Sequence, residues 1–262
     1  MDYSRYRLLK TERAGKVLTV AFNRPEALNA VNADLHREMS TIFADIRADA
    51  ETEAVVLTGV GRAFSAGGDI KWFKDMTPQQ LDALFTEGRK IIIDLLEVEQ
   101  PIIAAVNGAA VGLGATVALF CDVIIAAENA RIGDPHVQVG IVAGDGGAII
   151  WPWLVGPARA KEFLMTGEVV PAKEAERIGL VNRVVPPDQL MAEAMKLATR
   201  LANGPTRAIR GTKASVNKLL REAANLVLDT SLAREKETFL TRDHREAVDA
   251  FIEKRQPRFE GR

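Results

Sequence analysis

The sequence predicts an α/β fold with a partly parallel sheet and a helical C-terminal region. Two β-rich segments, residues 54–58 and 102–106, each run into closely spaced glycines, and a helical pattern lies between them. That strand–helix–strand order is typical of parallel pairing. From about residue 190 onward, alanine, leucine, lysine and glutamate dominate and strand signals are few. We therefore expect a core over residues 1–190 and a helical region over residues 191–262.

The elements of the N-terminal part follow from local patterns. Residues 6–12 and 16–22 are predicted to form a β-hairpin across Ala14-Gly15. Asn32 is the predicted N-cap of a helix that places apolar side chains on one face. Pro78 is expected to open a long helix that ends near residue 98.

The second glycine segment is followed by a predicted buried helix over residues 113–120 and short strands at 123–127 and 130–132. Residues 134–140 are expected to form a loop. The remaining expected elements are a helix over about 146–154, helices that begin near 157 and 171, a strand at 181–185, and helices to about 250.

The composition indicates a globular protein without nucleic acid or a membrane as its main partner. Of the 262 residues, 47% are hydrophobic, and the formal net charge of −1 gives no electrostatic reason to expect a polyanion or an anionic bilayer. No apolar run reaches the length of a membrane helix. The single cysteine, Cys121, lies in an apolar run, which excludes an internal disulfide and suits a buried structural thiol. We expect a soluble, cytoplasmic protein.

Several segments of the sequence come close to known catalytic motifs without matching them. Residues 112–117 follow a strand and open a helix, as a dinucleotide site does, but Val117 replaces the last glycine. Residues 63–67 lack one glycine of the nucleophile-elbow pattern, so Ser65 is predicted to be a turn residue. The histidines show no metal-ligand spacing with one another or with carboxylates; they are His36, His136 and His244. We expect neither a metal site nor a resident cofactor.

The segment at residues 102–122 has the most direct chemical meaning. Its strand, its glycines at 108, 112 and 114, and its helix start bring unpaired backbone N–H groups to a turn that a ligand can approach closely. Small residues there can also serve only to pack a helix tightly on a sheet, and the segment alone leaves both interpretations open. A second strand-to-glycine turn lies at residues 64–69.

With both turns, the chain resembles the crotonase family, also called the enoyl-CoA hydratase/isomerase family. The matching segments keep the family's order over nearly the whole chain: Asn23-Arg-Pro-Glu-Ala-Leu-Asn-Ala30, Gly61-Arg-Ala-Phe-Ser-Ala-Gly-Gly-Asp-Ile70, Pro101-Ile-Ile-Ala-Ala-Val-Asn-Gly108, Cys121-Asp122, Val139-Gly140 with Gly146-Gly147, and Phe251-Ile-Glu-Lys-Arg-Gln-Pro257. The resemblance implies a crotonase-like spiral of ββα turns, a C-terminal helical trimerisation region, and a homotrimer or a hexamer built as a dimer of trimers. It also implies an acyl-CoA thioester as substrate, in fatty acid metabolism, with coenzyme A as part of that substrate.

The resemblance places the thioester oxygen between the backbone N–H groups of Gly68 and Leu113. Such fixed donors stabilise an enolate without reorganising. The family commonly has glycine where this chain has Leu113, but a backbone donor survives a change of side chain. Implied contacts to CoA are Ala27, Leu28, Ala66, Ile70 and Lys254, the last of which can come from a neighbouring subunit. The acyl group is expected to lie among Trp72, Met76, Leu84 and Trp151. The i, i+4 spacing of Trp72 and Met76 also fits two core residues.

The chain departs from the hydratase pattern at both proton-transfer positions. Hydratases of the family use two glutamates, and these map onto Thr116 and His136. A threonine hydroxyl has no useful basicity near neutral pH, whereas histidine transfers protons in either direction. The pattern therefore argues against ordinary hydratase activity. The alternative for His136 is a loop histidine bonded to backbone.

Asp145 allows two interpretations as well. It stands in a turn before a helix, where it can cap that helix, and family members place catalytic acidic residues in or beside this loop. Two functional hypotheses follow. The first is a lyase or isomerase acting on an acyl-CoA thioester, with Gly68, Leu113, His136, Asp145 and Thr116 at the reacting end. The second is an acyl-CoA binding protein that has lost catalysis.

Overall fold

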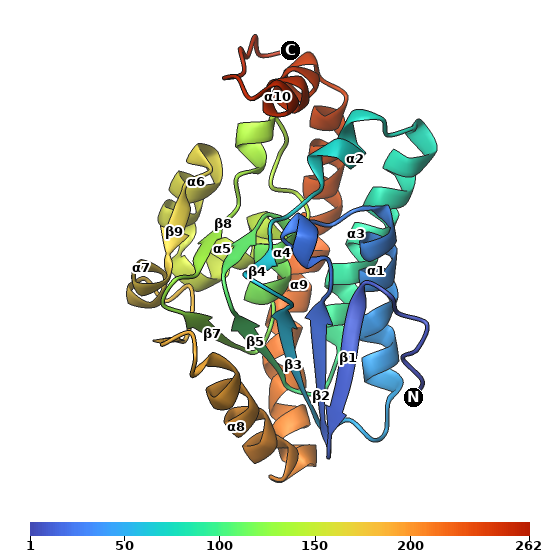
Figure 1. Cartoon of the computed structure of the whole chain (residues 1–262), viewed down its shortest axis with the longest axis vertical. Coiled ribbons are helices and arrows are strands. Elements are labelled where there is room, and N and C mark those ends of the chain that lie inside the picture. Colours follow the sequence, from blue (N-terminus) through green and yellow to red (C-terminus); the bar gives the residue numbers. More distant parts are fainter.

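The computed structural model describes all 262 residues and divides the strands between two sheets (Figure 1). The larger sheet has the order β1-β2-β3-β5-β7-β10 and the smaller one β4-β6-β8-β9. The strands are β1 (Leu9–Ala14), β2 (Val17–Phe22), β3 (Ala54–Gly59), β4 (Ala63–Ser65), β5 (Ile102–Val106), β6 (Ala109–Val111), β7 (Val123–Ala127), β8 (Arg131–Gly133), β9 (Val169–Pro171) and β10 (Arg183–Val185).

The helices include those predicted from the sequence. They are η1 (Pro25–Ala27), α1 (Ala33–Ala48), α2 (Ile70–Lys74), α3 (Pro78–Glu97), α4 (Leu113–Leu119), η2 (His136–Val139), α5 (Gly147–Val155), α6 (Pro157–Thr166), α7 (Ala172–Arg177), α8 (Leu190–Ala202), α9 (Thr206–Phe239) and α10 (Arg242–Glu253). The helices η1 and α2 were not predicted, and the segment at 134–140, expected to be a loop, contains the short 3-10 helix η2. None of the helices combines the length and the apolar character needed to cross a bilayer.

Local signals in the sequence account for the first elements. β1 and β2 pair antiparallel as the expected hairpin, and every other pairing in the larger sheet is parallel. The side chain of Asn32 accepts a hydrogen bond from the Leu35 N–H, which caps α1. Thr77 and Gln80 form a capping box at the start of α3, where Pro78 needs no N–H partner. The predicted α/β class is confirmed.

Helices cover both faces of the larger sheet. On one face, alternate residues such as Ala54 and Val56 of β3 pack with Ala194 and Ala198 of α8. On the other face, residues such as Leu57 pack into the main core with α1, α3 and α4. Because both faces are buried, β5 and β7 are apolar throughout rather than alternating.

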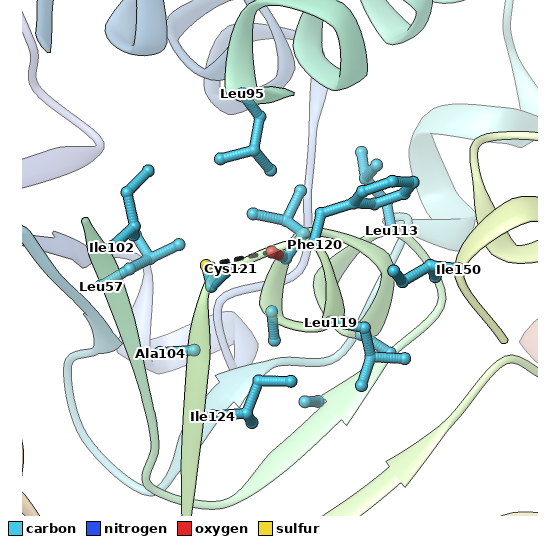
Figure 2. Close-up of a cluster of buried hydrophobic side chains, with 14 of the residues drawn as sticks. Leu57, Leu95, Ile102, Ala104, Leu113, Leu119, Phe120, Cys121, Ile124 and Ile150 are labelled. Carbon is cyan, nitrogen blue, oxygen red and sulfur yellow. Dashed lines mark hydrogen bonds between the residues drawn. The ribbon is translucent and has the colours of Figure 1, made fainter. Parts of the chain in front are cut away.

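Helix α4 lies in the main core and brings Cys121 with it (Figure 2). Every residue of α4 is buried. The Cys121 thiol donates a hydrogen bond to the Val117 carbonyl at 3.3 Å, and burial raises the pKa of this thiol. Figure 2 shows it among Ile102, Ala104 and Ile124. Cys121 is therefore a buried structural thiol, as predicted.

The C-terminal helices wrap around the core. α8 covers the larger sheet, α9 packs on α3 and α5, and α10 packs on α2 and η2 (Figure 1). The 34-residue helix α9 thus runs beside elements from the middle of the chain. The helical C-terminal region is confirmed, and its use in trimer formation stays a prediction.

Candidate active site

A cavity of about 110 Å³ opens between the two glycine turns, η2, α3 and α9. Its walls are mainly apolar, and its polar side chains are few. Those polar side chains are His36, Trp72, His136, Asp145 and Glu235. A largely apolar cavity with a few convergent polar groups is typical of a small-molecule site.

The two glycine turns touch each other at one wall of this cavity. A Cβ at Gly67 would lie 2.8 Å from the Val111 carbonyl oxygen, and one at Gly112 would lie 3.7 Å from the Gly67 Cα. Both glycines also have positive φ, of +82° and +53°. The left-handed backbone and the close approach at residue 67 together require glycine there.

The contact between the turns brings two backbone donors to the cavity. The Val31 N–H donates to the Gly67 carbonyl (2.7 Å), and the Val31 carbonyl accepts from the Asp69 N–H (3.0 Å). The N–H of Gly68, between these two residues, has no backbone partner. Leu113 is the first residue of α4, so its N–H has no partner within the helix. Both Gly68 and Leu113 line the cavity. The structure thus brings the two predicted donors together.

Three carboxyl groups surround His136 on η2. Its Nδ1 contacts the buried Asp134 carboxylate. Its Nε2 lies 3.6 Å from Asp145 Oδ2 and 3.9 Å from Glu235 Oε1. His136 and Asp145 both line the cavity, so the backbone-bonded alternative for His136 is wrong.

Thr116 supports Asp145 and does not face the cavity. Its hydroxyl donates to Asp145 Oδ1 at 3.2 Å, and the residue is fully buried. The cap of α5 is Gly146, with no side-chain hydrogen bond, so the capping alternative for Asp145 is wrong as well. Asp145 therefore contacts both Thr116 and His136, the two residues that map onto the hydratase glutamates.

The cluster holds protons tightly. Burial alone would lower the pKa of His136, but the charges of Asp134 and Asp145 outweigh it and hold that pKa well above its ordinary value. Burial raises the pKa of Asp145, partly offset by His136. Burial and the charge of Asp145 raise the pKa of Glu235 well above its usual range. The site therefore contains an imidazolium acid next to a carboxylate that is more basic than usual.

Two of the five predicted CoA contacts line the cavity, and the other three do not. Ala66 and Ile70 are among the lining residues. The Ala66 N–H donates to the Leu28 carbonyl at 3.0 Å, which fixes the 3-10 turn containing Ala27 beside it. Lys254 is exposed at the end of α10. Their contacts to CoA stay predictions.

Two of the residues expected around the acyl group lie elsewhere. Trp72 and Leu84 line the cavity, but Met76 does not. Trp151 is fully buried in the core, where it packs against Phe163. Met76 lies away from the cavity because α2 ends at Lys74, so Met76 does not share a helix face with Trp72.

Sequence reasoning missed Asp134, Glu235 and the position of His36 in the wall. The donor atoms of Asp134, His136 and Asp145 lie within 4.8 Å of one another, close enough for one metal ion. Spacing along the chain could not show this proximity, because Asp145 comes from a separate loop, and the expected absence of a metal site stays a prediction. The only available signal was Asp134 itself, two residues before His136.

The raised pKa of Glu235 gives a stability prediction. A protonated folded-state carboxyl stabilises the protein below the unfolded pKa, and this contribution is lost as pH rises toward the folded pKa. Glu235→Gln cannot titrate, so its free energy of unfolding relative to wild type should increase from pH 5 to pH 8. Urea unfolding across that range measures it. Parallel curves for the two proteins would show that Glu235 is charged in the folded state.

The structure is an α/β protein in which Gly68 and Leu113 line the same cavity as His136 and Asp145. The sequence profile of the enoyl-CoA hydratase/isomerase family matches residues 12–262. The chain belongs to this family, which confirms the resemblance found in the sequence.

Relatives and solved structures span nearly the whole chain. The short-chain-enoyl-CoA hydratase of Clostridium acetobutylicum is 41% identical over 94% of each chain. The structure of an enoyl-CoA hydratase/isomerase from Mycobacterium paratuberculosis is 37% identical, with a TM-score of 0.91 over 94% of this chain and 99% of that one. A β-diketone hydrolase from the cyanobacterium Anabaena, bound to (S)-3-oxocyclohexyl acetic acid, is 34% identical, with a TM-score of 0.84 over 90% of this chain and 96% of that one.

Proposed function

We propose that the chain is an enzyme that converts a carbonyl substrate through an enolate. The observation that carries the proposal is the position of the Asp134–His136–Asp145 cluster in the same cavity as the Gly68 and Leu113 donors. The substrate oxygen accepts from both N–H groups. As negative charge develops on that oxygen, donors already in place stabilise it, and one such donor typically contributes on the order of 3 kcal/mol.

Asp145 and His136 have different roles in moving protons to and from the substrate. Asp145 has a raised pKa, so it accepts a proton from water or from carbon more readily than an ordinary carboxylate. His136 is held as imidazolium by Asp134, so it delivers a proton to the enolate carbon. Thr116 keeps Asp145 in position. A base and an acid are thus present although both hydratase glutamates are replaced.

An acyl-CoA thioester is the first candidate substrate. Its support is the family and the curated relatives named as enoyl-CoA and crotonyl-CoA hydratases. Two of the residues implied for CoA, Ala66 and Ile70, lie at the cavity wall. Within this class, the pair of His136 and Asp145 supports isomerase or lyase chemistry at the carbons next to the thioester.

Hydrolysis of a carbon–carbon bond in a β-diketone is the second candidate, and a specific observation favours it. The glutamate pair that adds water to a double bond is replaced by the His136 imidazolium beside Asp145, and Asp145 takes the proton of a water that attacks a carbonyl. After attack, the bond between that carbonyl and the central carbon breaks. Its electron pair forms an enolate, which takes a proton from His136. The proton taken from water then passes from Asp145 to His136 and restores the imidazolium. The Anabaena relative is named a β-diketone hydrolase, which supports this reading.

A substrate panel with mass-spectrometric detection tests the proposal. It contains crotonyl-CoA, unsaturated acyl-CoA isomers, β-ketoacyl-CoA thioesters and β-diketones without CoA. Turnover of thioesters alone supports the first candidate, and a gain of one water by β-diketones supports the second. Calorimetric CoA binding without turnover of any compound would instead favour an inactive acyl-CoA binding protein and overturn the enzyme proposal.

A further inference from the structure

A second pair of polar side chains lies in the cavity wall, on helices other than those that carry the His136 cluster. It consists of His36 on α1 and Trp72 on α2, whose rings are 5.9 Å apart at an angle of 53°. His36 is 2% exposed. Both residues line the cavity, and neither takes part in the proton transfers proposed above.

His36 is fixed by a partner behind it. Its Nδ1 lies 2.7 Å from Glu87 Oε2, and that carboxylate also lies 4.0 Å from Arg37 Nε. With the proton of Nδ1 shared with Glu87, the remaining nitrogen, Nε2, is free for a ligand. A Cβ at Gly88 would be 4.0 Å from Nε2, so the glycine leaves open space beside this atom.

Trp72 supplies the second observation. Its indole Nε1 is buried and has no hydrogen-bond partner in the chain. Indole N–H groups usually find a partner when buried, and an unpaired buried donor is destabilising. A ligand oxygen in the cavity would remove this destabilisation.

We propose that Trp72 and His36 form a subsite that binds an oxygen function of the substrate, keto or hydroxyl, apart from the carbonyl held by Gly68 and Leu113. A keto oxygen accepts from the indole N–H. A hydroxyl accepts from it and also donates to His36 Nε2. The substrate then carries two oxygen functions joined by carbon that fits the apolar wall. This assignment rests on the proposed function for the place of the first carbonyl.

Ligand binding observed by NMR tests the subsite without turnover. The probes are short straight-chain carboxylates and their keto and hydroxy counterparts of the same length, because a carboxylate resembles the reacting carbonyl and suits the His136 imidazolium. The three tryptophans give three indole N–H signals, and the signal lost in Trp72→Phe identifies Trp72. We expect oxygenated ligands to move this signal downfield, whereas plain carboxylates leave it unchanged.

Affinities provide the control. Trp72→Phe should weaken the oxygenated ligands about tenfold, the size of one lost hydrogen bond, and leave plain carboxylates unaffected. Trp153→Phe, at a 47% exposed position, should change neither. An unmoved Trp72 signal in wild type at saturating oxygenated ligand, or equal weakening of both ligand classes, overturns the subsite. The enolate proposal fails separately, through absence of turnover in the substrate panel.

Discussion

His136→Gln is expected to lower kcat by about 10²–10⁴ on the substrate that the wild type turns over best, because glutamine cannot deliver a proton. Glutamine is polar and close in size, so it still fills the space beside Asp134. Binding should change less than turnover, since the Gly68 and Leu113 donors are backbone groups. Steady-state kinetics of the two proteins, with thermal unfolding to verify the fold, measures the effect.

The matched control lies on the same 3-10 turn. Val137 is 38% exposed, and a surface substitution such as Val137→Gln usually changes stability by no more than about 0.5 kcal/mol. Its kcat should equal that of wild type. A His136→Gln protein with unreduced kcat would remove this residue from the mechanism and leave the enzyme proposal itself intact.

Asp145→Asn is expected to have the next largest effect, a loss of about 10²–10³ in kcat. Asparagine keeps the shape and an oxygen that accepts from Thr116, but it cannot act as a base. Loss of the Asp145 charge also removes a contribution that raises the pKa of His136. The alkaline limb of the kcat profile, where His136 loses its proton, should therefore move to lower pH.

Thr116→Val tests whether Thr116 positions Asp145 or acts on the substrate itself. Valine has nearly the shape of threonine without the hydroxyl, so it removes only the 3.2 Å hydrogen bond to Asp145. A loss of about tenfold in kcat is the expected result, in line with one hydrogen bond. A loss as large as that of Asp145→Asn would mean that Thr116 acts on the substrate directly.

The fold was predictable because its signals are local. The hairpin, the Asn32 cap, the Pro78 helix start and the glycine turns each depend on a few neighbouring residues. Backbone donors at the helix start after Gly112 were predictable for the same reason, since a helix start leaves N–H groups unpaired wherever it occurs. The assignment of Gly68 and Leu113 as the donor pair came from the family resemblance.

The proton-transfer cluster was only partly predictable because it depends on distant parts of the chain. His136 and Asp145 were recognised, but Thr116 was assigned to the reacting end, whereas its hydroxyl points to Asp145. Glu235 reaches the cluster from α9 and carries no motif around it. The break after α2 likewise removed Met76 from the cavity wall.

The place of Glu235 on α9 also determines when the site is completed during synthesis. Chains grow from the N-terminus, so the two glycine turns and η2 leave the ribosome well before α9 does. Until then, the cavity lacks the wall that α9 provides, including Leu232, Glu235 and Phe239. The nascent chain therefore has no closed pocket around His136 until α9 has been synthesised and packed.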